Sequence, residues 1–403
     1  MTTHHNHSRQ RRAHDQVTAF ADARLAAIVP TLFDGTIEWG DAHSTSTHHI
    51  RDALLHRVGQ EPFAVTASLA YGTPLPELLH EQGANVAARM TAAHGRASRE
   101  TARVVAHRAV LAAIGCPPAP AVPAHLGPVL VVERTPSGAT LASKMLDTPH
   151  EVVDHIDRLW GSLAPLRLRT AANRMAAAAS LDRVGSIEAQ FAELWMADPL
   201  PDHIAEAGRG WVSGAALSGL RARLVHVAVR LMLTVPGTSE RVLAHGGLDS
   251  ADIVIRPPAP VPSCPRPHLA TPHADLATLV SRTAQHLIGA RTGTVVADTV
   301  TTDLYTWITA VEGPLAAHGI RRTQGLRDVL RLWAMDTLTT VAGYLALPPD
   351  VPILTPAQRG LAERAIEVLD LVESITHSLL GAHTPPATAL ADALDRVIVA
   401  ARA

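Results

Sequence analysis

The sequence is poor in cysteine and in aromatic residues. Two cysteines, Cys116 and Cys264, occur among 403 residues, too few for a disulfide framework or for a zinc site of four thiolates. Aromatic residues make up 3% of the chain, and they are too scattered to form a base-stacking platform. We therefore expect neither a disulfide-stabilised secreted domain nor a nucleic-acid partner.

Long apolar runs and a signal segment are also missing. No apolar stretch reaches the roughly 18 residues that a membrane-spanning helix needs. The first sixteen residues, MTTHHNHSRQRRAHDQ, lack the apolar core of a secretory signal. We therefore expect a cytoplasmic protein with no membrane partner.

Positive and negative charges are nearly balanced in the sequence. It contains 35 lysines and arginines against 37 acidic residues, for a formal net charge of −2, so no global field attracts nucleic acid or an acidic membrane. Lys144 is the only lysine among the basic residues. Any role that requires a side-chain amine therefore depends on Lys144.

Hydrophobic residues are plentiful and predict an α+β, mainly helical fold. They form 47% of the chain, enough for a sizeable core, and the abundance of Ala, Leu and Arg favours helix over sheet. Short strands are predicted at 63–69, 85–90 and 129–133, with a helix at 98–114. After residue 140 the patterns are helical, apart from a stretch at 242–272 that is rich in Gly, Pro and His. The predicted helices there are 149–164, 186–197, 212–234, 273–289, 299–317, 323–346, 356–381 and 386–402.

The composition changes along the chain and predicts three segments. Residues 1–60 are expected to be an N-terminal extension, partly disordered, with short helical patterns at 16–29 and 50–58. Residues 61–140 are expected to form a small sheet-plus-helix unit. Residues 141–403 are expected to form a larger helical unit.

Short motifs follow one another in a recognisable order. In the small unit, Ser-Arg-Glu-Thr at 98–101 opens the predicted helix, a Pro-containing turn follows at 115–118, and the apolar run 127–134 ends in Glu-Arg. In the large unit, His-Gly-Gly-Leu-Asp-Ser-Ala-Asp at 245–252 precedes an apolar strand, and Pro-His-Ala-Asp-Leu-Ala follows at 272–277. This order resembles the aminoglycoside-phosphotransferase-like kinases over residues 61–290. The resemblance implies a bilobal kinase-like fold with a small N-lobe and a helical C-lobe.

The motif at 245–252 resembles the catalytic loop of that family but departs from it at the base. The matched catalytic positions are His245, Gly247 and Asp249. Gly247 stands where the family has its catalytic aspartate, and a glycine neither accepts a proton nor orients a hydroxyl. Asp249, two residues on, is the carboxylate nearest to that position in the sequence.

The matched metal positions are Asp252 and Ser263. Asp252 corresponds to the metal-binding asparagine, and Ser263 lies where the second metal aspartate is expected. No Asp or Glu occurs between Ile253 and Ala274, whereas Mg²⁺ requires hard oxygen ligands. A single neutral hydroxyl is a poor replacement for a carboxylate, so weak dependence on Mg²⁺ is expected.

The matched cofactor-binding positions are Arg89, Glu100 and Glu133. Arg89, on the predicted strand 85–90, stands where the family has its phosphate-binding lysine, and Glu100 is its expected ion-pair partner. Glu133 ends the apolar strand before the hinge. A glycine-rich phosphate loop is reduced to residues 70–73, Ala-Tyr-Gly-Thr.

These departures favour a pseudokinase, because phosphoryl transfer depends on a catalytic carboxylate, a cation on the phosphates and metal ligands. We expect a binding or scaffold protein that acts with a partner enzyme or a peptide substrate and binds ATP weakly. Phosphotransferases of the family that the motifs resemble often serve bacterial specialised metabolism, including peptide natural products, and the resemblance permits such a setting here.

Two alternatives stay open from the sequence. One is an active atypical phosphotransferase that uses Arg89, Asp249 and Asp252 to move the γ-phosphate of ATP to a small-molecule or peptide hydroxyl. The other takes 242–272 as a Pro-rich crossover in an unrelated helical protein.

Overall fold

The computed structural model describes most of the chain. The described residues are 2–45, 47–57, 59, 61–73, 75–80, 85–116, 122–134, 138–167, 186–196, 210–212, 214–236, 241–262, 268–315, 322–347, 349, 353–381 and 384–402. The chain divides into two compact units. The first comprises residues 1–109, 118–137 and 347–355, and the second comprises 110–117, 138–346 and 356–403.

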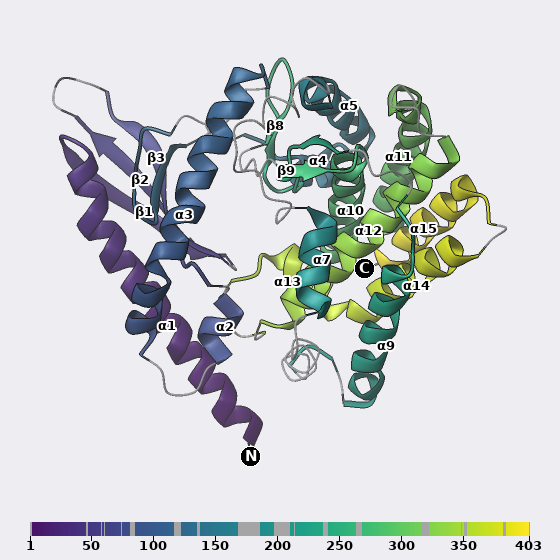
Figure 1. Ribbon diagram of the computed structural model, residues 1–403, viewed down its shortest axis with the longest axis horizontal. Helices are drawn as coiled ribbons and strands as arrows, with labels where there is room; N and C mark the ends of the chain where they lie inside the picture. Colours follow the sequence, from purple (N-terminus) through teal and green to yellow (C-terminus); the bar gives the residue numbers. More distant parts are fainter. Residues whose placement is uncertain are drawn as a thin grey trace. The chain divides into compact units, whose positions relative to one another are not determined.

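A sheet of antiparallel strands forms the centre of the first unit. In the described residues its order is β1-β2-β3-β5-β4, and Figure 1 labels β1, β2 and β3. The strand bounds are Thr36–Ser44 for β1, His48–His56 for β2, Phe63–Ala70 for β3, Ala124–Leu126 for β4 and Val129–Glu133 for β5. The strands predicted at 63–69 and 129–133 are thereby confirmed. The register of β1 against β2 shifts between Trp39 and Ala42, as at a β-bulge.

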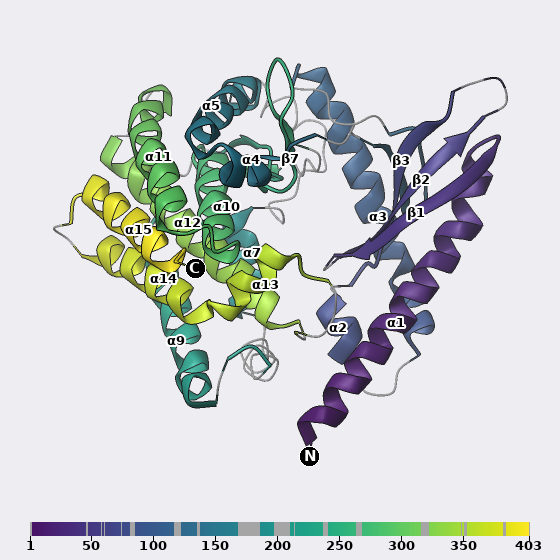
Figure 2. The same ribbon diagram turned by 180° about the vertical axis from the view of Figure 1, so that it is seen from behind.

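In the described part of the first unit, three α-helices pack with this sheet, the last of them continuing into residues of the second unit. They are α1 (Thr2–Ile28), α2 (Leu75–His80) and α3 (Val86–Ala113), and Figure 2 shows α1 beside the strands. Alternate residues of a strand point to one face, and on this face Leu55, Val65 and Val131 are buried. They form a single core with residues of all three helices, including Val17, Ala21, Leu25, Leu75 and Met90.

Two local predictions in this unit are wrong. Residues 50–56, predicted as part of a helix, lie in β2, where pairing with β1 and β3 buries Ala53 and Leu55. Tertiary pairing outweighs local preference in such strands. Residues 85–90, predicted as a strand, begin α3. There the Asn85 side chain accepts hydrogen bonds from the N–H groups of Ala87 and Ala88 at 2.9 and 3.4 Å, as an N-cap does.

The predicted boundaries near these elements change accordingly. Ser98, expected to cap a helix, lies within α3, where its hydroxyl donates to the carbonyl of His94 at 2.8 Å. Residues 2–56, expected to form a partly disordered extension, contain α1 and the first two strands of the sheet. The pairing of β2 with β3 over eight residue pairs makes this segment part of the small unit.

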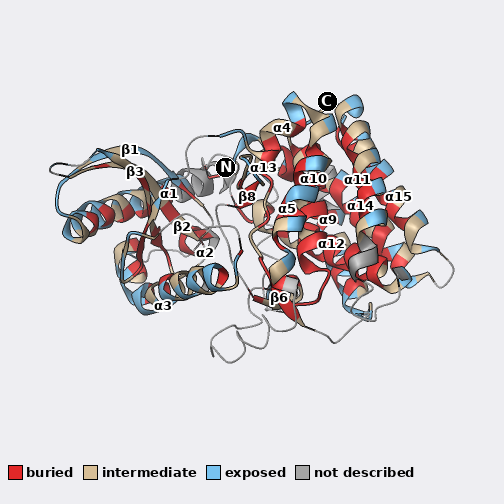
Figure 3. Cartoon of the chain, turned by 90° about the horizontal axis from the view of Figure 1, so that it is seen from above, coloured by how far each residue is buried: buried red, intermediate tan, exposed pale blue. Residues whose placement is uncertain are grey.

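The second unit is an assembly of helices around one apolar core. The helices predicted after residue 140 are confirmed where the structure describes them, and one helix that was not predicted, at 141–147, is added. Their bounds are α4 Leu141–Asp147, α5 Val152–Ser162, α7 Ile187–Met196, α9 Gly214–Met232, α10 Ala274–Gly289, α11 Thr294–Leu315, α12 Arg322–Leu345, α13 Pro356–Glu363, α14 Ala365–Leu380 and α15 Pro386–Ala400. One predicted helix, 356–381, is divided into α13 and α14 at Arg364. Buried residues line the inner faces of these helices (Figure 3). Trp333 of α12 is fully buried in this core.

The described residues of the Pro-rich stretch between α9 and α10 form two short antiparallel strand pairs. β6 (Val242–Ala244) pairs with β9 (His268–Ala270), and β7 (Ile253–Val254) pairs with β8 (Val261–Pro262). The segment 245–252 therefore runs from β6 to β7. The predicted α+β, mainly helical architecture, with a small sheet-plus-helix unit and a large helical unit, is confirmed.

No helix in the described ranges is both long enough and apolar enough to cross a membrane.

Candidate functional site

The 245–252 loop is attached to the start of α10 by one carboxylate. Asp275, in the first turn of that helix, accepts the backbone N–H of His245 at 3.0 and 2.8 Å and that of Gly246 at 3.1 Å. Gly246 has a φ of +69°, a conformation that favours glycine. A carboxylate that accepts several backbone N–H groups makes strong, charge-assisted hydrogen bonds, so Asp275 fixes the direction in which the loop leaves β6.

His245 is part of this scaffold. Its side chain is buried, and its Nδ1 accepts the N–H of Gly247 at 3.3 Å. Burial lowers the pKa of His245 to about 4, although the Asp275 charge opposes the shift. The imidazole is therefore neutral at pH 7, and its Nδ1 is occupied by the backbone of its own loop.

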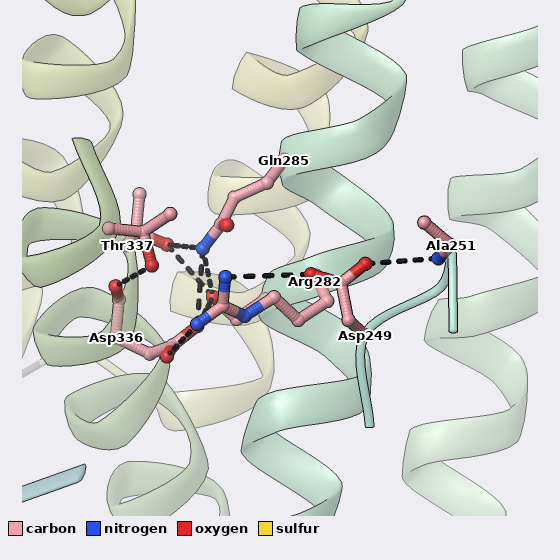
Figure 4. A network of polar contacts seen from close by, with 8 residues as sticks. Asp249, Ala251, Arg282, Gln285, Asp336 and Thr337 are labelled. Atoms are coloured by element: carbon pink, nitrogen blue, oxygen red, sulfur yellow. Dashed lines mark hydrogen bonds and ion pairs between the residues drawn. The ribbon is translucent and has the colours of Figure 1, made fainter. Parts of the chain in front are cut away.

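Asp249 is engaged on both carboxylate oxygens (Figure 4). Its Oδ1 accepts the N–H of Ala251 at 3.0 Å, and its carbonyl accepts the N–H of Asp252 at 2.9 Å. Its Oδ2 lies 3.7 Å from Nη1 of Arg282 on α10. Asp249 thus closes a tight turn and faces a guanidinium.

A network of polar side chains between α10 and α12 holds that guanidinium (Figure 4). Arg282 Nη2 donates to Asp336 Oδ1 at 2.9 Å. The other oxygen of Asp336 accepts the Ser281 hydroxyl at 2.7 Å and the Gln285 amide at 3.2 Å. Asp336 is buried, and charged groups in the interior persist when such partners surround them.

Of the two predicted metal positions, the structure describes one. Asp252 is half-buried at the end of the loop, just before β7, whereas Ser263 lies outside the described residues. Within the described ranges, no group of three or more His, Cys, Asp or Glu side chains is placed to hold a metal ion. Of the two carboxylates of the loop, Asp249 accepts the Ala251 N–H and faces Arg282.

The predicted ion pair between Arg89 and Glu100 is wrong. Both residues lie on α3, where eleven residues correspond to about 16 Å along the axis. Arg89 Nη1 donates to the carbonyl of Leu78 at 3.2 Å, and Glu100 Oε1 lies 3.9 Å from His48 Nε2. The strand prediction for 85–90 had placed Arg89 opposite the helix, and that strand does not exist.

The other predicted positions of the small unit, Glu133 and Gly72, lie in a strand and in a bend packed against a helix. Glu133 is exposed at the end of β5, paired across the sheet with Val65. Gly72, in the expected phosphate loop, has a φ of +69°, and a β-carbon there would lie 2.6 Å from the Ala93 carbonyl of α3. Gly72 is therefore a close-packing position against a helix.

The only lysine also has a partner. Lys144, on α4, places its Nζ 3.3 Å from Glu151 Oε2. The hydroxyl of Thr148 donates to the same oxygen at 3.0 Å. This hydrogen bond and the Lys144 amine lower the pKa of the Glu151 carboxyl, so the pair stays charged.

A chain of Ser–His–Asp hydrogen bonds in the first unit, with a buried serine and histidine and a half-buried aspartate, was not found from the sequence. Ser44 Oγ lies 3.2 Å from His49 Nδ1, and His49 Nε2 lies 2.9 Å from Asp22 Oδ1. The Tyr71 hydroxyl donates to Ser44 Oγ at 3.0 Å, and Arg51 Nη1 donates to Asp22 at 3.3 Å. These spacings suit nucleophilic catalysis, but Ser44, His49 and Tyr71 are buried. These hydrogen bonds therefore tie α1 to the sheet.

Comparison with known proteins gives matches of structure alone. No protein-family model and no curated protein sequence matches the chain. The fold is similar to an ethanolamine kinase of Plasmodium vivax, with 12% identity, coverage of 84% of this chain and 83% of that chain, and a TM-score of 0.45. It is also similar to a glucosamine kinase, with 14% identity, 91% and 97% coverage and a TM-score of 0.30.

A further glucosamine kinase structure contains glucosamine, ADP and inorganic phosphate; it shares 12% identity over 91% of this chain and 96% of that one, with a TM-score of 0.27. All three of these similar structures are described as kinases of small molecules. At such identities the likeness concerns the fold and extends to neither substrate nor activity.

Proposed function

We propose that this chain is a kinase-like protein that transfers no phosphate and acts by binding: a pseudokinase. The 245–252 loop is the observation that supports this most directly. Gly247 has no side chain at the position that the resemblance assigns to the catalytic base. The nearest carboxylate of the loop, Asp249, accepts the Ala251 N–H and faces Arg282.

His245 does not replace the missing base. A general base must reach the proton that it removes and have a pKa near the working pH. The His245 ring is buried, its Nδ1 accepts the N–H of Gly247, and its pKa is lowered to about 4. An imidazole in these surroundings positions the loop and exchanges no proton with an acceptor at pH 7.

The first unit lacks, in its described strands and in its sequence, the features that hold phosphates in protein kinases. Protein kinases hold the phosphates with a lysine on the third strand, paired to a glutamate of the following helix, and with a glycine-rich loop. Strand β3, with the sequence FAVTASLA, has no basic residue. Glu100, the only acidic residue of α3, faces His48 of β2. The connection from β1 to β2 contains no glycine, since none occurs in the sequence between Gly40 and Gly59. These features support weak nucleotide binding.

The binding role that remains is proposed by analogy with the family that the motifs resemble. The partner is a biosynthetic enzyme or a peptide substrate, and the setting is bacterial specialised metabolism in the cytoplasm. ATP, where it binds, serves as a weak ligand with little dependence on Mg²⁺.

The test combines binding with turnover. Thermal unfolding of the full chain is followed with ATP, with and without Mg²⁺, and transfer from γ-labelled ATP is measured to an amino alcohol, an amino sugar and a Ser/Thr-rich peptide. The expected result is a small thermal shift that EDTA leaves unchanged and no transfer above a heat-killed control. Transfer to any acceptor above that control overturns the proposal, and Asp249 and Asp252 are then the residues to replace.

A matched variant sharpens the turnover measurement. Gly247→Asp supplies one missing catalytic group. When catalytic groups act as a unit, restoring one of them alone recovers little of the rate. The variant is therefore expected to transfer no label either. Recovery of transfer in Gly247→Asp shows that the rest of the machinery is intact and contradicts a deficit spread over several positions.

A further inference from the structure

Arg282 lies between two carboxylates that come from different elements. Its guanidinium donates to Asp336 of α12 at 2.9 Å and lies 3.7 Å from Asp249 of the 245–252 loop (Figure 4). Burial lowers the pKa of Arg282, but the two carboxylates outweigh burial and raise it. An arginine does not lose its proton in a protein, so this position holds a permanent positive charge.

The surrounding groups keep that charge in place. Asp336 is oriented by Ser281 and Gln285, and the same Gln285 amide lies 3.3 Å from the Thr337 hydroxyl. The charges of Arg282, Asp249 and Asp336 also act on Tyr344, whose pKa burial raises to about 12. The phenol is therefore neutral at pH 7. One guanidinium and two carboxylates are the charged groups of this cluster.

The neighbouring histidine adds no charge. His286 lies one turn after Arg282 on α10, and burial lowers its pKa although the Asp249 charge opposes the shift. The imidazole is neutral at pH 7. Asp249 thus receives its compensating charge from Arg282.

We propose that the Arg282 guanidinium takes the place of a bound cation at the 245–252 loop, neutralising Asp249 and keeping divalent ions from binding there. Two carboxylates that converge on one position are the ligands that Mg²⁺, Mn²⁺ or Ca²⁺ requires. Here a side chain fills that position, held by α12 and directed at the loop. The inference rests on the proposed function, in which nucleotide binding depends little on Mg²⁺. It gives a physical reason for that independence.

The test measures Mn²⁺ binding by the full chain in the absence of nucleotide. Thermal unfolding is followed at constant ionic strength while Mn²⁺ is added to the wild type, Arg282→Met and Arg282→Lys. Removal of one partner leaves buried charge uncompensated, so Arg282→Met should unfold at a lower temperature. Mn²⁺ should then raise its unfolding temperature in a saturable manner, since a ligand of the native state stabilises it. The wild type and Arg282→Lys should give no saturable rise.

Two further variants complete the design. Arg282→Gln retains a donor for Asp336 without the charge, and it should show the same response to Mn²⁺ where Arg282→Met does not fold. Arg291→Met removes an exposed ion pair with Glu363, whose charged atoms lie 2.6 Å apart, and it should behave as the wild type does.

Either of two results overturns the inference. One is a saturable stabilisation of the wild type by Mn²⁺ that Asp249→Asn abolishes. The other is the lack of any Mn²⁺ response in folded Arg282→Gln. Because no nucleotide is present, these results are separate from phosphate transfer, which alone decides the proposed function.

Discussion

Gly360 of α13 packs directly against the backbone of Gly289 at the end of α10. A β-carbon built on Gly360 falls on the carbonyl oxygen of Gly289, and one built on Gly289 falls on the carbonyl of Ala357. Backbone atoms of two packed helices cannot yield as a flexible side chain does. The two glycines therefore set how closely α10 and α13 approach, and α10 holds the 245–252 loop.

Gly360→Ala is expected to destabilise the protein by about 1–3 kcal/mol or more, the usual cost of overpacking. Urea unfolding monitored by circular dichroism measures the loss. Gly343→Ala on α12 is the matched control, because its β-carbon would meet no heavy atom within 4 Å. A helical Gly→Ala change in open space stabilises by about 0.5–1 kcal/mol. Equal effects of the two substitutions contradict the close packing.

His245 should make the protein less stable in acid. Its pKa in the folded state, about 4, lies below the 6.5 of an exposed histidine, so between these values the unfolded chain binds more protons. The stability that depends on neutral His245 is complete above pH 6.5 and is lost as the pH falls toward 4, by about 3 kcal/mol. Urea unfolding at a series of pH values measures this loss.

His245→Asn isolates that contribution, because an amide oxygen can accept the Gly247 N–H without titrating. The stability of this variant should fall less steeply between pH 6.5 and 4 than that of the wild type. His226→Asn, at an exposed position of α9, should leave the slope unchanged. A wild-type slope in His245→Asn shows that other groups cause the loss.

The Ser–His–Asp hydrogen bonds of the first unit should show strong coupling between Ser44 and Tyr71. Ser44→Ala leaves the Tyr71 hydroxyl and His49 Nδ1 buried without this partner, at a cost of about 1–3 kcal/mol for each group. Tyr71→Phe removes one donor and should cost about 0.5–1.5 kcal/mol. The double variant should lose less than the sum of the single losses, and a double-mutant cycle by urea unfolding measures the difference. Additive losses contradict the shared hydrogen bond.

Arg89→Ala and Glu100→Ala should have additive effects on stability. The residues are separated by about three turns of α3, and distant substitutions usually add within about 0.3–0.5 kcal/mol. Thermal or urea unfolding of both single variants and the double variant tests this. A coupling energy above 1 kcal/mol contradicts the helical placement of Arg89 and restores the ion pair that the sequence suggested.

The sequence predicted the parts of this fold whose signals are local. The apolar run at 129–133 and the amphipathic patterns after residue 140 became β5 and the helices of the second unit, because burial of one face is encoded within each segment. The strand prediction for residues 85–90 was wrong although it also relied on a local pattern. Their partial alternation is typical of a strand, whereas their alanine content favours a helix and the Asn85 side chain caps one.

The sequence predicted a loop at 245–252, which the structure contains, but it did not predict the interactions of that loop. The motif at 245–252 located the loop, yet the role of Asp275 depends on contacts with residues about thirty positions earlier. The pairing of Arg282 with Asp336 spans a still longer separation, from α10 to α12. No periodicity or motif in a single sequence reports such contacts, since each residue taken alone reads as an ordinary polar position of a helix.

The first unit includes residues 347–355, and this affects when that unit can complete its core during synthesis. Leu347 and Ile353 are buried in the core of that unit together with strands from the first third of the chain. During synthesis, the small unit therefore lacks part of its interior until most of the large unit has left the ribosome. A fragment that ends at residue 137 should expose the apolar surface that these two side chains cover, and such surface favours aggregation. Expression trials should start from the whole chain.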